Sequence, residues 1–186
     1  MTLPFCKHRV GATLAVAQYG RRGFVEHRER KNMRLREYDY AQEGPYFITV
    51  CTDKKKSILA VFEPGEEGRQ PKIKPTELGS MTESVLQELT HRYGFDLYAY
   101  VVMPNHVHLL ISPGKSGMTV GKFIGAWKSV VSNRWQKVCT SRGVVMGKLW
   151  QRNYYDHVIR KETDFLEKWK YIEENPVKWQ KDELFP

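Results

Sequence analysis

The chain has few cysteines and no long apolar run. Its three cysteines, Cys6, Cys51 and Cys139, are far apart and form no CxxC pair. This spacing argues against a disulfide framework or a cysteine-rich zinc site and favours a reducing, cytoplasmic setting. No apolar stretch reaches the roughly 18 residues that a membrane-spanning helix needs. The sequence therefore predicts a cytoplasmic protein without a membrane partner.

Acidic residues are missing from a long internal stretch. From Leu97 to Tyr155 there is no Asp or Glu, and the whole chain has 30 Lys and Arg against 21 Asp and Glu, a net charge of +9. Because an ordinary solvated surface mixes both signs, this stretch is expected to face a polyanion. The candidate DNA-contacting residues are Lys115, Lys122, Lys128, Arg134 and Arg152, together with Arg34 and Arg36 nearer the N-terminus.

The N-terminal region is a second basic block. Residues 1–40 hold nine Lys and Arg and four Asp and Glu, and they have little hydrophobic periodicity before Tyr38. We expect residues 1–36 to be a flexible tail, disordered when free and in contact with phosphates when DNA is bound. Residues 37–186 are expected to form one domain, which would associate with the nucleoid when it binds DNA.

Hydrophobic patterns predict an α+β fold. Strands are expected at 46–52, 97–103, 106–112 and 154–160, and helices at 76–93, 119–138 and 162–175, with Pro176 ending the last helix. Residues 54–70 are expected to form a loop or short hairpin. The order βαββαβ with an extra C-terminal helix is the ferredoxin-like pattern. It implies an antiparallel sheet with helices on one face, an open second face, and the first and third strands at its centre.

A pair of histidines lies on the third predicted strand. His106 and His108 are two residues apart, so their side chains share one face, while Val107, Leu109 and Ile111 share the other. Two imidazoles side by side on a strand can supply half of a metal site. The alternative is two unrelated histidines on a polar sheet face.

A tyrosine and an asparagine share one face of the last predicted helix. Tyr171 falls nearly opposite the apolar stripe of Phe165, Leu166, Trp169 and Ile172, and Asn175 is four residues further on. A core tyrosine would lie on the stripe. Considered alone, Tyr171 could equally be an exposed tyrosine near a helix end.

Three ordered motifs carry a family resemblance. The segments PNHVHLL, WQRNYYDHVIR and YIEENPVKW, with the opening MRLREYDY before EGPYFITVCT, resemble the REP-associated and IS200-like tyrosine transposases of the HUH superfamily over about residues 33–180. The resemblance implies that His106 and His108 are metal ligands, that Asn175 is a third ligand through its side-chain oxygen, and that Tyr171 is the nucleophile. It implies further that Tyr154 and Tyr155 are structural or DNA-facing, while His157 is expected to be a packing residue.

The implied activity is cleavage and strand transfer of single-stranded DNA through a 5′-phosphotyrosine, at a sequence or hairpin, by a monomer or a homodimer. A phenol is a weak nucleophile at neutral pH. A divalent ion on two imidazoles and an amide oxygen would neutralise charge on the scissile phosphate. Such ligands suit Mg²⁺ or Mn²⁺, and the ligand types alone would also accept zinc. The covalent link retains the phosphodiester energy, so no ATP is needed.

Other functions remain open at this point. A histidine-triad nucleotide hydrolase would need a third histidine where the chain has Leu110, and a two-histidine phosphoesterase would need a second HxT or HxS motif, which is absent. The alternative without catalysis is a domesticated protein that binds single-stranded DNA hairpins and no longer cuts them.

Overall fold

The computed structural model describes residues 44–65, 71–114, 117–182 and 184–185. The predicted tail 1–36, with Arg34 and Arg36, lies outside the described residues, as does Lys115.

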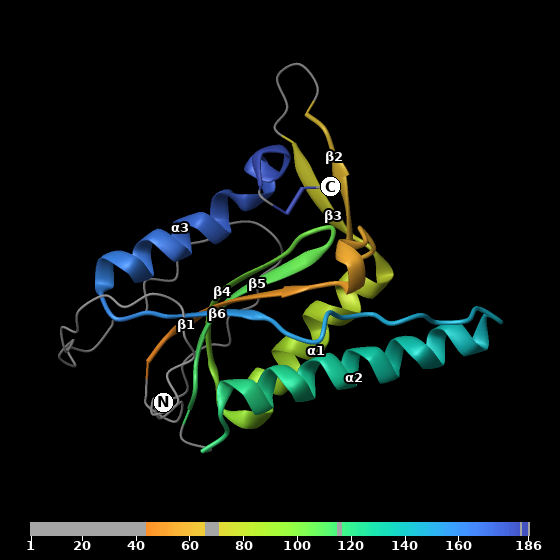
Figure 1. Ribbon diagram of the computed structural model, residues 1–186, viewed down its shortest axis with the longest axis horizontal. Coiled ribbons are helices and arrows are strands. Elements are labelled where there is room, and N and C mark those ends of the chain that lie inside the picture. Colours follow the sequence, from red (N-terminus) through yellow and green to blue (C-terminus); the bar gives the residue numbers. More distant parts are fainter. Residues whose placement is uncertain (1–43, 66–70, 115–116, 183, 186) are drawn as a thin grey trace, which may run out of the picture.

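A four-stranded antiparallel sheet lies at the centre of the fold (Figure 1). Its strands β1 (Tyr46–Cys51), β4 (Asp96–Val102), β5 (His106–Ser112) and β6 (Tyr155–Val158) have the order β4-β5-β1-β6. The central position of the first and third predicted strands is therefore confirmed. β1 and β5 pair so that Thr49 is opposite His108 and Cys51 is opposite His106.

Two helices, α1 (Glu77–Tyr93) and α2 (Val120–Ser141), cover one face of the sheet (Figure 1). The α1 helix begins where the Thr76 side chain accepts a hydrogen bond from the Gly79 backbone at 3.1 Å, and Gly94 ends it in the left-handed region at φ 66°. The main core contains apolar side chains of both helices and of the sheet face that carries Val107, Leu109 and Ile111. The predicted ferredoxin-like α+β fold is confirmed.

The second face is covered as well. The α3 helix (Glu162–Lys178) crosses it and continues into a 3₁₀ turn, η2 (Trp179–Lys181). Between α3 and the sheet lies a smaller apolar cluster of Phe47, Leu110, Ile159 and Ile172. The expectation of an open second face is therefore wrong where α3 lies on the sheet. The amphipathic last helix needs an apolar surface on which to pack.

The prediction that Pro176 ends the last helix is also wrong. Pro176 lies inside α3, which runs on to Lys178. A proline removes one helical N–H and disfavours helical backbone in the preceding residue, but tertiary packing can override this preference. The side chain of Trp179, directly after the helix, is only 2% exposed, and its burial holds the last turn against the domain. Asn175 consequently keeps a helical position.

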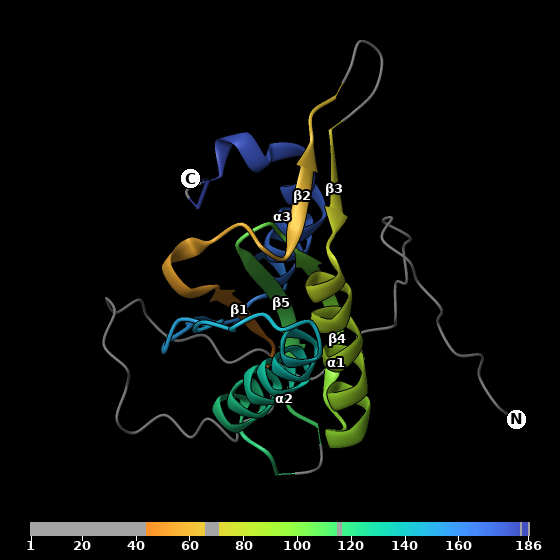
Figure 2. The ribbon, with the colours of Figure 1, turned by 90° about the vertical axis from the view of Figure 1, so that its right-hand side faces the viewer.

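A hairpin projects from the domain (Figure 2). It consists of β2 (Ala60–Glu63) and β3 (Lys72–Pro75) and follows a short 3₁₀ turn, η1 (Asp53–Lys55). Of the two structures expected for residues 54–70, a loop or a short hairpin, the hairpin is the one that forms. Its first strand lies in that range, and its second strand begins at Lys72. Over the described ranges, no helix is long and apolar enough to cross a membrane.

Gly79 is required by a close approach between α1 and the segment before β2. A Cβ at this position would meet the Leu59 carbonyl oxygen at 1.9 Å, and this oxygen already accepts a hydrogen bond from Thr76 N at 2.9 Å. We expect Gly79→Ala to lower the free energy of unfolding by about 1–3 kcal/mol. Gly125→Ala is the matched control, because nothing lies within 4 Å of its added methyl group. It should stabilise α2 by about 0.5–1 kcal/mol. Urea denaturation would measure both, and stabilisation by Gly79→Ala would contradict the close approach.

Candidate active site

The two histidines of β5 point toward each other. Their Nε2 atoms are 2.9 Å apart, and both side chains are buried, with 0% exposure for His106 and 2% for His108. Strand geometry places them on the face that α3 covers, while the residues between and beyond them pack into the main core. The sequence expectation of a shared face is confirmed, but the histidines are buried.

Each histidine has a second polar partner that orients its ring. The Nδ1 atom of His106 lies 2.8 Å from the Asn105 side-chain oxygen, and Nδ1 of His108 lies 2.8 Å from the Thr49 hydroxyl. An amide oxygen can only accept, so Nδ1 of His106 carries the proton and its Nε2 is left with a lone pair. The threonine hydroxyl can accept from His108 in the same way. Both Nε2 atoms can then serve as ligands of one cation, as in histidine metal sites generally.

Burial keeps both imidazoles in the neutral form that binds metal. It lowers the pKa of His106 to about 4, an effect that the negative charge of Asp182 partly opposes. It lowers the pKa of His108 well below the usual value, and the neighbouring His106 and Lys168 act in the same direction. A neutral imidazole has no proton to lose before it binds a metal ion.

Asn175 presents an unpaired oxygen at the same place. Its Nδ2 donates to the Asp182 carboxylate at 3.1 Å, which fixes the orientation of the amide because a carboxylate can only accept. Its Oδ1 is buried and has no hydrogen-bond partner among the described residues. A buried oxygen without a partner is unfavourable unless another group binds it. Asn175 therefore fits the role of an oxygen ligand, which remains a prediction.

Asp182 is a site residue that the sequence reasoning missed. Ligand atoms of His106, His108 and Asp182 all lie within 4.8 Å of one another, so the three could hold one metal ion. In the sequence, Asp182 is seven residues beyond Asn175 and after the last predicted helix. Its position depends on η2, which turns the chain back toward the histidines. The only signal was an acidic residue soon after the YIEENPVKW motif.

Tyr171 lies beside the histidine pair. Its ring makes edge contacts with His108 at 5.2 Å and with Phe47 at 5.8 Å between ring centres. Its hydroxyl donates to the Asp182 carboxylate at 3.2 Å, and the side chain is 43% exposed. The sequence pattern put Tyr171 nearly opposite the apolar stripe of the last helix, but its ring lies at the edge of the buried face of α3. The buried face is wider than the stripe, because it covers the histidine site as well as the apolar cluster. Leu166, expected on the apolar stripe, is 59% exposed.

An aromatic ring and a cation complete the surroundings. Phe47 stacks on His108 with ring centres 5.2 Å apart, and the Lys168 ammonium lies 5.4 Å from the centre of the Phe47 ring. Lys168 is one turn of α3 before Tyr171. The site thus has a positive charge close to the tyrosine, which would favour an anion there.

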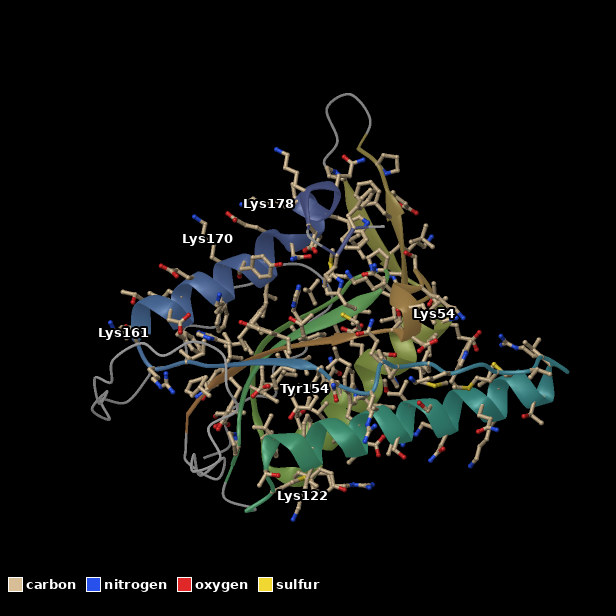
Figure 3. The ribbon with its side chains drawn as sticks, in the orientation of Figure 1. Lys54, Lys122, Tyr154, Lys161, Lys170 and Lys178 are labelled. Atoms are coloured by element: carbon tan, nitrogen blue, oxygen red, sulfur yellow. The ribbon has the colours of Figure 1, made fainter. Side chains whose placement is uncertain are left out.

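The other candidate side chains of the WQRNYY motif point elsewhere. Tyr154 packs against the main core on the α2 side of the sheet (Figure 3). Tyr155 pairs with Thr49 across β6 and β1, so it lies on the α3 face, and it is 55% exposed. His157 is held by Asp164 at 2.7 Å, outside the histidine site.

Two of the predicted DNA-contacting residues share a groove. Lys128 of α2 and Arg152 line a groove of about 390 Å³ between α2 and the segment 146–152, together with Lys148 and Trp150. The Lys128 ammonium donates to the backbone carbonyls of Gln151 and Arg152, and burial lowers its pKa. The groove adjoins the histidine end of the sheet, because Gln151 N donates to the carbonyl of Cys51, which pairs with His106.

The remaining basic residues are dispersed. Arg134 faces α1 and forms an ion pair with Glu88 at 2.7 Å. Lys122 lies at the start of α2, on the other side of the sheet from Lys170 and Lys178 of α3 (Figure 3). The acid-free stretch therefore does not form a single basic surface, because acidic residues of α1 neutralise part of it. Contact of any of these residues with DNA remains a prediction.

Comparison with known proteins identifies the family. Residues 68–175 match the sequence model of the family described as "Transposase IS200 like". A Haemophilus influenzae protein without an assigned function is 28% identical over 84% of this chain and 93% of its own length. A provisionally named REP-associated tyrosine transposase of the same organism is 26% identical over 75% of this chain and 74% of its own length.

A solved structure has a similar fold. The structure of a REP-associated tyrosine transposase bound to a REP hairpin matches 83% of this chain and 74% of its own chain, with a TM-score of 0.51 and 18% identity. The family match covers more than half of the chain, 108 of 186 residues from 68 to 175. This chain therefore belongs to the IS200-like transposase family.

Proposed function

We propose that this protein is a metal-dependent transposase that cleaves and rejoins single-stranded DNA through a covalent bond to Tyr171. The observation that carries the proposal is the convergence, within one chain, of the Tyr171 ring, the buried histidine pair and the unpaired Asn175 oxygen. A fold alone hosts many functions, whereas this arrangement combines a nucleophile with a ligand set.

The ligand set suits a hard or borderline divalent ion. His106 and His108 would supply imidazole nitrogens, and Asn175 and Asp182 would supply oxygens. Two nitrogens with oxygens favour Mn²⁺ or Mg²⁺. When bound, the ion would neutralise charge on the scissile phosphate. The Asn105 and Thr49 contacts would hold the two rings in the tautomer required for binding.

In the proposed reaction one bond to phosphorus forms and one breaks. The Tyr171 oxygen attacks the phosphorus of one phosphodiester and forms a phosphotyrosine bond, while the bond from phosphorus to the 3′ oxygen breaks. The phenolic proton passes to the Asp182 carboxylate, which already accepts its hydrogen bond, and the departing 3′ oxygen takes a proton from water. A 3′-hydroxyl can later attack the phosphotyrosine and restore the phosphodiester.

The proposed substrate is a DNA hairpin with single-stranded flanks. The matched solved structure is a complex with a REP hairpin, and the groove of Lys128, Lys148 and Arg152, on the α2 side of the sheet, offers basic side chains to the DNA outside the histidine site. A test would incubate the protein with Mn²⁺ and hairpin oligonucleotides from the DNA that flanks its gene. We expect an adduct that survives denaturing electrophoresis and disappears with a chelator. Tight hairpin binding without any adduct would favour the domesticated binding protein instead.

The groove leads to a prediction about salt dependence. Affinity for single-stranded DNA should fall with salt by a slope of roughly −0.7 per phosphate contact. The Arg152 guanidinium forms no ion pair with any described residue, so Arg152→Ala should reduce the slope by about one contact. The matched control, Arg134→Ala, should change it less because Glu88 already engages that arginine. Fluorescence anisotropy at several salt concentrations would measure the slopes, and equal effects of the two variants would contradict the assignment of the groove.

The proposed tail contact can be tested in the same assay. Deletion of residues 1–36 should make the slope shallower by a few contacts if this basic segment binds phosphates. An identical slope in the truncated protein would show that the segment takes no part in binding.

A further inference from the structure

A second hollow lies at the base of the β2–β3 hairpin, beside the candidate active site. Its volume is about 360 Å³, and aromatic and aliphatic side chains line most of it: Val61, Phe62, Pro104, Trp179 and Phe185. Phe185 is 44% exposed, so an aromatic ring of the hollow is accessible from solvent.

Trp179 lies between this hollow and the histidine pair. The ring of Trp179 lines the hollow and also lies 5.7 Å from the ring of His106, and the ring of Phe185 packs on Trp179 at 5.3 Å. Pro104 in its wall is two residues before His106. The Asn105 side chain, which orients His106, also donates to the Leu184 carbonyl at 2.7 Å and so ties the chain next to Phe185 to the site.

The hairpin has two different faces. Val61 of β2 pairs with Lys74 of β3 and both are exposed, whereas Phe62 pairs with Ile73 and both are half-buried. Because successive side chains of a strand point to opposite faces, Phe62 lies on the face that is turned toward the domain, and Lys74 lies on the other face. The described lining of the hollow is thus mainly aromatic and aliphatic, with no charged residue.

We propose that this hollow binds a nucleobase of the DNA strand, belonging to a nucleotide next to the scissile phosphate. The inference rests on the proposed function, since it requires a strand whose phosphate reaches the histidine pair. Aromatic side chains bind bases of single strands by stacking on them. A base held against Phe62 or Phe185 would fix the adjacent phosphate relative to Tyr171, which is how positioning contributes to rate.

The test uses a hairpin oligonucleotide with single-stranded flanks and a series of the same oligonucleotide with one abasic site at each flank position. Binding is measured in a Tyr171→Phe background, so that cleavage does not interfere. Phe62→Leu and Phe185→Leu should each weaken binding of the intact oligonucleotide by roughly 5- to 100-fold. At one flank position, that of the base held in the hollow, the abasic oligonucleotide should bind the Tyr171→Phe parent and both Leu variants with equal affinity, because the stacked base is already missing. Phe62→Tyr and Phe185→Tyr should bind the intact oligonucleotide as tightly as the parent does, because tyrosine keeps an aromatic face for stacking.

Val145→Ala is the matched control, because Val145 is apolar and 95% exposed but lies outside the hollow. It should leave all affinities unchanged. Unchanged binding of the intact oligonucleotide by both Leu variants, or the same loss at every abasic position, would overturn the base-binding role. Failure of the proposed cleavage would show itself separately, as wild-type protein that binds the intact oligonucleotide but forms no adduct.

Discussion

His106→Ala and His108→Ala should each reduce formation of the DNA adduct by more than about 100-fold. Each change removes one of two buried nitrogens that lie 2.9 Å apart, and no other described histidine lies within the same ligand group. Hairpin binding should change by less than about threefold, because it depends on basic and aromatic surface outside this pair. Denaturing electrophoresis of the adduct and anisotropy of a labelled hairpin would measure the two effects.

Metal binding gives a readout that does not depend on activity. The thermal stability of the wild-type protein should rise with Mn²⁺ concentration, since a ligand that binds only the native state stabilises it. Both histidine variants should lose this rise, and Thr49→Val should weaken metal affinity by about 10- to 100-fold through the lost contact to His108. His157→Ala is the control, because Asp164 holds this histidine outside the site. Full cleavage by either variant, with metal still required, would contradict the ligand assignment.

The two oxygen donors can be separated by the same measurements. Asn175→Ala removes a neutral oxygen that water can replace, so its effect on metal affinity should be the milder one. Asp182→Asn removes a negative charge close to both histidines and leaves one acceptor oxygen where the carboxylate had two. It should therefore weaken metal affinity more than Asn175→Ala does. The opposite order would leave Asn175 as the principal oxygen ligand.

Local patterns were sufficient to predict the elements that hold the site. β5 was predicted at its observed bounds, because a run of β-branched and aliphatic residues follows a Pro-Asn turn. The period of a strand then set His106 and His108 on one face with the core residues on the other. The same reasoning gave α1, because Thr76 and Gly94 are strong signals for the two ends of a helix.

Local sequence patterns could not predict the contacts between distant residues that complete the site. Asp182 joins the histidines only because α3 continues through Pro176 and η2 turns back, and both depend on the burial of Trp179. The burial of the histidines depends on where α3 packs, which helical periodicity does not specify. Arg134 pairs with Glu88, which is 46 positions away and outside the acid-free stretch. The composition of that stretch alone therefore could not predict that its charge is partly neutralised.

Tyr171→Phe should eliminate the covalent adduct while leaving fold, metal affinity and hairpin binding close to those of the wild type. The change removes one hydroxyl, which donates to Asp182 at 3.2 Å, and keeps the ring that contacts His108 and Phe47. The adduct should then be lost, because the proposed phosphotyrosine bond forms through this hydroxyl. Tyr155→Phe is the sharpest control, because Tyr155 lies on the same face of the sheet and pairs with Thr49, the partner of His108. It should still form the adduct, as should Tyr154→Phe, whose ring packs against the main core on the other side of the sheet. Peptide mapping of trapped DNA should find attachment at Tyr171, and attachment at any other residue would refute this role.

Mixing two inactive variants would show whether the tyrosine serves its own chain. The ring of Tyr171 lies 5.2 Å from that of His108 within one chain, so the geometry supports cleavage by a monomer. A mixture of Tyr171→Phe and His108→Ala should then remain inactive, because every molecule lacks either the nucleophile or a ligand. If α3 instead exchanged between two copies, one in four sites of a statistically mixed dimer would combine an intact Tyr171 with an intact His108. Recovery of about a quarter of the wild-type adduct would therefore reveal a dimer that acts in trans, and its absence at high protein concentration would establish action within one chain.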